Sequence, residues 1–216
     1  MIINLGSQVS VINQFISELR DVEVQKDSMR FRRNLERCGE VFAYEISRKL
    51  DYQDKEVVTL LGVANVPMLT EYPVLGTILR AGLPLHQGLL NVFDKSENAF
   101  VSAYRKHRKD GEFTIKIEYI SSPELTDRIL ILSDPMLATG LSVSLAYKEL
   151  IARGKPKHTH FVSVLASTQG VEYIKKHFSK TDVTLWVGAI DDELTAQAYI
   201  VPGLGDAGDL AYGKKL

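Results

Sequence analysis

One stretch near the middle of the chain, residues 129–142, most constrains what the chain can fold into. Residues 129–132 are apolar and β-prone, which predicts a buried strand. Asp134 follows where that strand would end, and a loop of small residues leads to apolar residues at helical spacing between Val143 and Ile151. The stretch therefore predicts a strand, an acid, a short loop and a helix.

Such a unit suits a phosphorylated sugar. Ligands of open α/β sheets bind outside the carboxyl ends of the strands, and a helix start there offers unpaired N–H groups to a phosphate. Thr139 and Ser142 add hydroxyl donors. The carboxylate of Asp134 only accepts hydrogen bonds, so it suits sugar hydroxyls or water around a metal ion. A plain strand-to-helix connection explains the same spacing, and the residue pattern leaves both interpretations open.

Composition limits the class of protein. A length of 216 residues predicts one α/β domain over residues 1–216, and 45% hydrophobic with 25% charged residues is ordinary for a globular protein. A net charge of −1 gives no bulk attraction to nucleic acid or anionic membranes, so neither is an expected partner. The lone Cys38 allows no internal disulfide. No membrane-length apolar run or signal-peptide pattern is seen, which predicts a cytoplasmic protein.

The remaining elements follow from periodicity. Two amphipathic helices are predicted by apolar stripes at Val9, Ile12, Phe15, Ile16 and Leu19, and at Phe31, Leu35, Cys38, Phe42, Ile46 and Leu50. Strands are expected at 57–61, 75–79, 99–104, 113–119, 161–166 and 183–187, helices after Pro84 and at 170–178, and a loop at 65–73. Strands that alternate with helices predict a Rossmann-like parallel sheet flanked by helices.

Charged segments have competing interpretations. Arg80 ends a predicted strand before Ala81 and Gly82, which favours an anion site over a structural ion pair. The basic run at 105–109 precedes a hairpin-turn signal at 110–111. Arg30, Arg33 and Arg37 share one helical face, for which a solvated surface is favoured over an anion or RNA patch. The acidic residues 191–193 are expected in solvent, and the glycine-rich tail at 202–213 is expected to be an ordered Ω-type loop.

Three segments resemble the uracil phosphoribosyltransferases. Residues 134–140 (DPMLATG) are similar to the family's phosphoribosyl-diphosphate loop, residues 78–83 (ILRAGL) to its diphosphate-binding turn, and residues 199–209 (YIVPGLGDAGD) to its uracil-binding segment. The resemblance extends from the first helices to the C-terminus. It implies a type I phosphoribosyltransferase core with a β-hairpin arm and a small hood formed by the C-terminal segment.

The resemblance also implies a reaction, in which uracil and 5-phospho-α-D-ribose 1-diphosphate give UMP and diphosphate with Mg²⁺. It assigns catalytic roles to Arg80, Arg105 and Asp134. It assigns the sugar donor to these three and to Pro135, Met136, Leu137, Ala138, Thr139, Gly140, Leu141, Ser142 and Asp206. It assigns uracil to Ile200, Gly205, Asp206 and Ala207. Mg²⁺ would be held by diphosphate and water rather than directly by the protein, and the protein would be a homo-oligomer, a dimer or larger.

Three positions depart from the family pattern. Leu141 stands where glycine is usual, residues 106–109 are basic where the family is acidic, and the tail reads LAYG at 210–213 without the usual basic residue and phenylalanine. If position 141 needed positive φ, leucine would be strained there. We expect negative φ at Leu141, with Gly140 adopting the unusual dihedral instead.

Two other functions remain open from the sequence. The first is a phosphoribosyltransferase for another base, since only the 199–209 segment argues for uracil. The second is a transferase-like regulator that binds RNA through Arg30, Arg33, Arg37 and the basic run, against which stands the near-neutral net charge.

Overall fold

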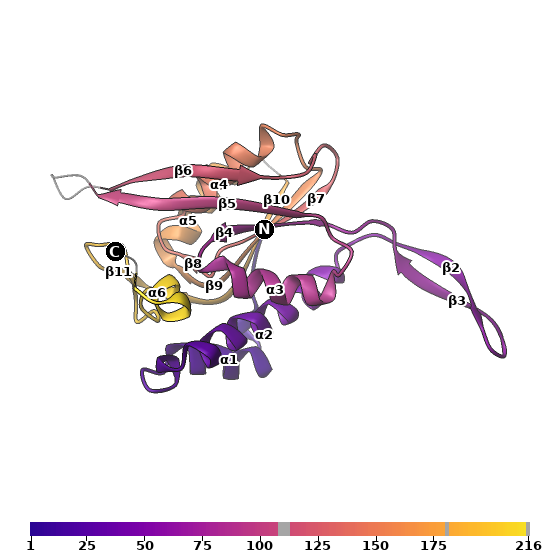
Figure 1. The fold of residues 1–216 in the computed structure, drawn as a ribbon, viewed down its shortest axis with the longest axis horizontal. Helices are drawn as coiled ribbons and strands as arrows, with labels where there is room; N and C mark the ends of the chain where they lie inside the picture. The colour runs from indigo at the N-terminus through magenta and orange to yellow at the C-terminus, as the bar shows by residue number, and fades with distance from the viewer. Residues whose placement is uncertain (108–112, 180–181, 215–216) are drawn as a thin grey trace.

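A mostly parallel, eight-stranded sheet forms the centre of the protein (Figure 1). The computed structural model describes residues 1–107, 113–179 and 182–214, without the side chains of residues 103–116. Along the sheet the order is β1-β10-β9-β7-β4-β5-β6, and β8 adds to β9. The strands are β1 (Ile2–Asn4), β4 (Val74–Leu79), β5 (Asn98–His107), β6 (Phe113–Ser121), β7 (Ile129–Ser133), β8 (Met136–Leu137), β9 (His158–Ser167) and β10 (Val183–Asp191). Only β5 and β6 pair antiparallel within this sheet.

Helices cover both faces of the sheet because strand side chains alternate between two cores. On β7, Ile131 packs into the core shared with α1 (Val11–Arg20), α2 (Ser28–Ser47) and α3 (Gly82–Val92). Its neighbours Leu130 and Leu132 pack into the core shared with α4 (Leu141–Ile151) and α5 (Thr168–Phe178). The α1–α3 layer and the α4–α5 layer lie on opposite sides of the sheet (Figure 1). The predicted α/β fold is confirmed.

The shorter elements lie at the margins of this core. They are the 3₁₀ turns η1 (Leu5–Ser7) and η2 (Val24–Lys26), the hairpin of β2 (Tyr52–Thr59) and β3 (Gly62–Leu69), the pair β11 (Glu193–Leu194) and β12 (Ile200–Val201), and the short helix α6 (Ala207–Tyr212). We call β11, β12 and α6 with their connections the hood. Its apolar residues Ile200, Leu204, Ala207 and Ala211 join the core of α1–α3.

The helical predictions hold, with one correction. Of the first stripe, Ile12, Ile16 and Leu19 are buried, but Val9 precedes α1 and is fully exposed. Every member of the second stripe is buried, including Leu50 beyond the end of α2. Cys38 is buried and unpaired, as expected for a packing residue.

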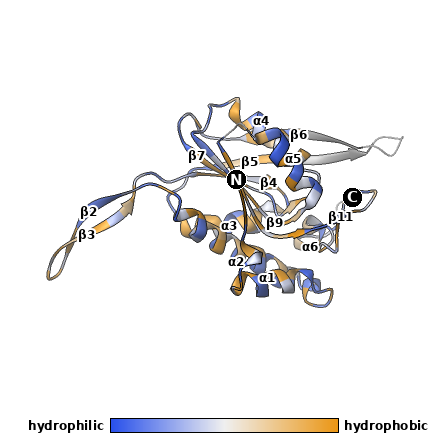
Figure 2. Cartoon of the chain, turned by 180° about the vertical axis from the view of Figure 1, so that it is seen from behind, coloured by the Kyte–Doolittle hydropathy of each residue, from blue (hydrophilic) through white to orange (hydrophobic). Residues whose placement is uncertain are grey.

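The predicted loop at 65–73 is wrong. Residues 62–69 form β3, which pairs antiparallel with β2 in a hairpin that projects away from the sheet (Figures 1 and 2). β2 in turn spans residues 52–59 rather than 57–61. Side chains on both faces of this hairpin are exposed, so no alternation of apolar and polar residues marks it. Pro67 argued for a loop, yet a two-stranded ribbon tolerates proline because each strand has a free edge.

Other differences concern short or charged segments. β1 and β8 were not predicted, because strands of two or three residues carry no readable periodicity. The tail at 202–213 contains the short helix α6 rather than a purely Ω-type loop. Asp191 was expected in solvent but is buried at the end of β10, where its charge is paired with Arg20. Both strands of the predicted β5–β6 hairpin are present, and its turn lies outside the described residues.

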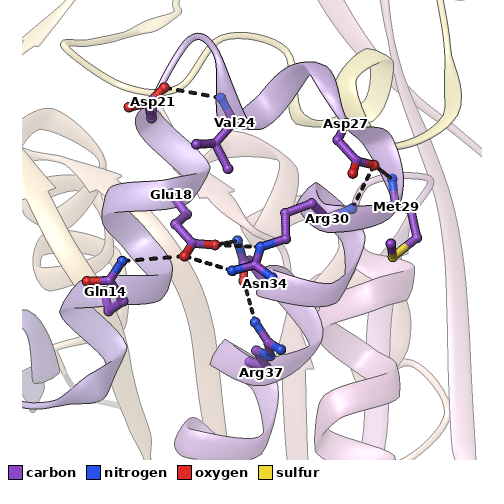
Figure 3. Close-up of polar contacts among 9 residues, drawn as sticks. All are labelled: Gln14, Glu18, Asp21, Val24, Asp27, Met29, Arg30, Asn34 and Arg37. Atoms are coloured by element: carbon purple, nitrogen blue, oxygen red, sulfur yellow. Dashed lines mark hydrogen bonds and ion pairs between the residues drawn. The ribbon is translucent and has the colours of Figure 1, made fainter.

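A carboxylate at the α1–α2 contact organises the helical layer (Figure 3). Glu18 accepts hydrogen bonds from Arg30 at 2.7 and 2.9 Å and from the buried Asn34 at 2.7 Å. Arg37 in turn donates to the Asn34 oxygen at 3.2 Å. The Arg30 and Asn34 hydrogen bonds lower the pKa of Glu18 to about 2. Two arginines of the predicted arginine face, Arg30 and Arg37, therefore make hydrogen bonds within the protein.

This network predicts a pH-dependent contribution to stability. Because the folded pKa of Glu18 is below its unfolded value, its contribution is present above about pH 4.5 and fades as pH falls toward 2. Glu18→Gln should destabilise the protein at pH 7 by about 1 kcal/mol, since Arg30 is partly exposed and the pair is screened. We expect thermal melting to fall by roughly 2–4 °C at pH 7, with the gap closing at acid pH.

The control is Glu23→Gln, which breaks an exposed ion pair with Lys26 on the neighbouring turn. It should change the melting temperature by less than half as much. Equal melting of wild type and Glu18→Gln at pH 7 would contradict the importance of the network.

Candidate functional site

Parallel pairing of β4 and β7 brings two residues of the predicted site, Arg80 and Asp134, to one edge of the sheet. In their register Thr77 lies opposite Ser133, so Arg80 and Asp134 follow the ends of adjacent strands. The Ser133 hydroxyl donates to the Gly76 carbonyl at 3.1 Å, which fastens the strands near their ends. After Arg80 the chain passes close to Thr77, where a Cβ on Gly82 would lie 2.2 Å from the Thr77 hydroxyl oxygen. Glycine is therefore required at position 82.

The loop between β7 and α4, residues 134–140, is fastened to β9 along its length. The Asp134 N–H donates to the Val162 carbonyl at 3.0 Å, and the Ser163 hydroxyl donates to the Asp134 carbonyl at 2.6 Å. The Pro135 carbonyl accepts from two β9 amides at 3.0 Å, and the Ser167 hydroxyl donates to the Ala138 carbonyl at 2.6 Å. Hydrogen bonds to β9 thus hold the loop in shape.

The loop ends with Gly140 in the left-handed region at φ 80°, and α4 begins at Leu141. Leu141 lies outside the left-handed region, as expected, so Gly140 takes the unusual dihedral. The ring of Tyr173 from α5 packs against Gly140, and a Cβ there would lie 2.7 Å from a ring carbon. Gly140 is required twice, for its dihedral and for this close approach.

A small pocket opens where the loop meets α4. It is lined by Asp134, Met136, Leu137, Ala138, Thr139, Gly140, Ser142 and Val143. The N-terminus of an eleven-residue helix, two hydroxyls and one carboxylate meet there. Such a helix end attracts a phosphate, and the carboxylate at the opposite end of the loop accepts from hydroxyl groups. Pro135 does not line this pocket; its carbonyl faces β9.

Arg80 joins this edge to the hood. Its guanidinium lies 3.1 Å from the Asp209 carboxylate on α6 and donates to the Gly213 carbonyl at 3.4 Å. Arg80 is half-exposed, so it remains open to an external anion while α6 supports one side. Arg80 therefore connects two segments far apart in the sequence.

The 199–207 segment mixes buried residues with exposed ones. Ile200 and Ala207 are buried, whereas Gly205 has φ 95°. The Asp206 side chain caps α6 by accepting from the Asp209 N–H at 3.0 Å. Backbone groups of this segment are presented in a fixed conformation, which suits recognition of a small planar ligand by hydrogen bonds.

The base of the hood is held by a charge pair. Arg20 of α1 makes a two-pronged contact with Asp191 at 2.7 and 2.8 Å, and Asp191 accepts from the Gly203 N–H at 2.9 Å. Burial alone would raise the pKa of Asp191, but the hydrogen bonds from Arg20 and Gly203 lower it below its usual range. The carboxylate is therefore charged at neutral pH.

Other charged residues singled out from the sequence lie apart from this edge. Arg30 pairs with Glu18, and Arg33 pairs with Glu36 at 2.6 Å, which weakens the case for an anion patch on α2. Arg105 lies on β5 with its Cα opposite that of Ile115, and its side chain is outside the described residues, as are residues 108 and 109 of the basic run. Burial lowers the pKa of His160 to about 3, so this histidine is a neutral packing residue.

In the described part of the chain, no three His, Cys, Asp or Glu side chains are grouped so that they could hold a metal ion. No described helix combines the length and apolar character needed to span a membrane.

Sequence reasoning missed the residues that support the site. Ser163 and Ser167 lie on a buried strand, where small polar residues give no periodic signal of their bonding. Asp209 belongs to the recognised C-terminal segment, but nothing in the sequence links it to Arg80. The sequence shows that Asp191 lies just beyond a predicted strand. The pattern of residues could not show that its carboxylate is buried.

Comparisons with known proteins agree with this geometry. A family model described as uracil phosphoribosyltransferase matches residues 7–214. A protein of Porphyromonas gingivalis named uracil phosphoribosyltransferase is 56% identical over 215 residues, covering 100% of this chain and 99% of that relative. One of the same name from Pyrococcus furiosus is 37% identical, covering 94% and 86%. The structure of the AQ2163 protein from Aquifex aeolicus has a TM-score of 0.87 at 30% identity, covering 99% and 98%.

The β7–α4 loop predicts unequal losses of stability for substitutions at its neighbouring residues 140 and 141. Gly140→Ala introduces a Cβ at positive φ and against Tyr173, so it should destabilise the protein by more than about 1 kcal/mol. Leu141→Gly removes nothing that the loop requires and should cost under about 1 kcal/mol through unfolded-state entropy. Urea unfolding of both variants measures the difference. A Gly140→Ala protein as stable as wild type would show that the loop relaxes freely.

Proposed function

The chain belongs to the uracil phosphoribosyltransferase family, and from this membership we propose how its residues transfer a phosphoribosyl group to uracil. The substrates are uracil and 5-phospho-α-D-ribose 1-diphosphate, and the products are UMP and diphosphate. The observation that carries the residue assignments is that the β7–α4 loop and Arg80 follow the ends of adjacent strands, and that Arg80 contacts α6 of the hood.

The donor is proposed to lie along the β7–α4 loop. Residues 138–142 surround its 5′-phosphate, with the N-terminus of α4 and the hydroxyls of Thr139 and Ser142 as donors. Asp134 accepts from the ribose hydroxyls, and Met136 and Leu137 form walls of the pocket. Pro135 supports the loop through its carbonyl, which accepts from two β9 amides. Arg80 and Arg105 hold the diphosphate by charge-assisted hydrogen bonds.

Uracil is proposed to bind the hood through Ile200, Gly205, Asp206 and Ala207. Uracil presents carbonyl and N–H groups in alternation, and backbone groups of this segment offer the complementary pair in fixed geometry. One oxygen of Asp206 caps α6 by accepting from the Asp209 N–H. A carboxylate only accepts hydrogen bonds, which suits donor hydroxyls or metal-bound water.

In the reaction, the bond between ribose C1 and the diphosphate oxygen breaks and the electron pair leaves with diphosphate. A bond forms between C1 and the uracil ring nitrogen, whose proton passes to water, so that UMP and diphosphate are the products. Arg80 and Arg105 stabilise the charge that develops on the leaving group, and the fixed loops hold the reacting atoms in line. No protein nucleophile is needed.

Mg²⁺ fits the donor set of this site. The site offers two carboxylates, Asp134 and Asp206, on separate segments, and Mg²⁺ typically binds one or two carboxylates together with substrate phosphates and water. When bound, the ion would neutralise part of the diphosphate charge. Asp134 and Asp206 would hold it through water.

We also propose that the protein is a homo-oligomer, a dimer or larger, and acts in the cytoplasm. The β2–β3 hairpin supports the first proposal because it projects from the sheet (Figure 2). Its exposed apolar side chains include Val58, Leu60 and Leu61. Such a surface is typical of a protein interface. Neither nucleic acid nor a membrane is an expected partner, since arginines of the α2 face are paired within the chain.

The direct test is formation of UMP and diphosphate from purified protein, donor and a panel of free bases. We expect uracil to be used and cytosine, adenine and hypoxanthine to be rejected, with activity abolished when Mg²⁺ is removed by EDTA. Equal or better use of another base would contradict the assignment of the 199–207 segment to uracil.

Substitutions separate the donor site from the uracil site. Arg80→Ala should raise the donor KM by roughly one to two decades and change the uracil KM little, because it removes a charge-assisted contact of about 1.5–3 kcal/mol. Asp134→Asn should fold normally and lose most activity, because an acceptor becomes half donor.

The control for Arg80 is Arg48→Ala, which removes an exposed arginine paired with Glu45 at the end of α2. Its kinetics should match wild type. Unchanged donor kinetics in Arg80→Ala would refute the diphosphate assignment, and wild-type turnover in Asp134→Asn would leave Asp134 as a strand-end residue only.

A further inference from the structure

We propose that Arg20 and Asp191 are positioning residues for uracil, which fix the backbone turn at Gly203 and through it the 200–207 segment. The inference rests on the proposed assignment of that segment to the base. Neither residue belongs to the three segments whose sequence suggested the function. Both lie at the base of the hood, and neither lines the proposed donor pocket.

Four hydrogen bonds close a ring between three elements. Arg20 donates to both Asp191 oxygens at 2.7 and 2.8 Å, and its Nη1 also donates to the Gly203 carbonyl at 3.0 Å. The Gly203 N–H donates back to Asp191 Oδ2 at 2.9 Å. Both backbone groups of Gly203 are thus bound by one ion pair, which comes from the end of α1 and the end of β10.

The turn that this pair grips is tight. Gly203 has φ 58°, and a Cβ there would lie 2.0 Å from the Ile200 carbonyl oxygen. Ile200 precedes the turn and Gly205 follows it, so both proposed uracil contacts depend on how the turn is held. A displacement of Gly203 would move the backbone groups that read the base, whereas the β7–α4 loop is fastened separately to β9.

Because the ion pair is buried, each of its charges depends on the other. The Asp191 side chain is 6% exposed and that of Arg20 is 24% exposed. A buried pair seldom adds much net stability, because desolvation offsets the attraction, but loss of one partner leaves a charge unpaired. The two-pronged contact of the Arg20 guanidinium with Asp191 fixes direction as well as distance, which suits a role in positioning the Gly203 turn.

The surroundings of Arg20 permit a decisive test. A solvent-open pocket of about 470 Å³ borders Arg20 and is lined also by Ser17, Gly188 and Ala189. Truncation of Arg20 would extend this pocket toward Asp191, so a small planar cation could enter from solvent. Guanidinium ion has the size, charge and donor geometry of the missing group.

The experiment measures the KM for uracil and for the donor separately in Arg20→Ala, Asp191→Asn, the double variant and wild type. We expect the uracil KM to rise roughly tenfold in each single variant, with the donor KM within about twofold. The double variant should be no worse than the poorer single one, because both residues act through one ring. Arg20→Lys, which keeps the charge but loses the fork, should show an intermediate uracil KM and serves if Arg20→Ala folds poorly.

Chemical rescue and a matched control complete the design. Millimolar guanidinium ion should lower the uracil KM of Arg20→Ala but not of Asp191→Asn, and sodium at equal ionic strength should do neither. Asp192→Asn alters the exposed neighbour of Asp191 and should behave as wild type. Thermal melting of each variant reports loss of folded protein independently.

The outcomes are distinguishable. Parallel changes in the KM values of uracil and donor, additive effects in the double variant, or no rescue by guanidinium would overturn the positioning role while leaving the proposed function intact. A wild-type protein that forms no UMP from uracil would overturn the proposed function, and this inference with it.

Discussion

The parallel pairing of β4 and β7 is the constraint on which the rest of the site depends. Because Thr77 lies opposite Ser133, the two strands end at the same edge of the sheet, and Arg80 and Asp134 follow their ends. Hydrogen bonds from β9 then fix the path of the β7–α4 loop, because they bind its backbone from Asp134 to Ala138. The proposed phosphate pocket follows from sheet register and a helix start, with two hydroxyls and a carboxylate as its polar side chains.

The hood is held differently, by arginines from three separate elements. Arg20 grips Gly203 together with Asp191, Arg32 of α2 donates to the Ala211 carbonyl at 2.6 Å, and Arg80 contacts Asp209 and Gly213. Apolar burial of Ile200, Leu204 and Ala207 holds the hood against the helical layer, while the arginines set its direction. Arg80 contacts the hood and is also proposed to bind the diphosphate, so one side chain links the hood to the proposed diphosphate site.

The sequence predicted the parts of this arrangement that have local patterns. The run at 129–132, the small-residue loop and the helix after Leu141 were readable because strand, turn and helix each leave a periodic or compositional trace. The strand β3 was missed because its side chains are exposed on both faces, so burial imposed no alternation on them. Asp191 was misplaced for a related reason: an acid after a strand looks solvated until its partner Arg20, 171 positions away in the sequence, is brought to it by the fold.

The account requires that the β7–α4 loop and the 199–207 segment bind the two ends of one product molecule. A crystal structure of the protein with UMP tests this most directly. We predict the 5′-phosphate within hydrogen-bonding distance of backbone N–H groups of residues 138–142, and the uracil ring against Ile200 and the backbone of residues 205–207. A phosphate bound elsewhere, or a uracil ring turned away from the hood, would contradict it.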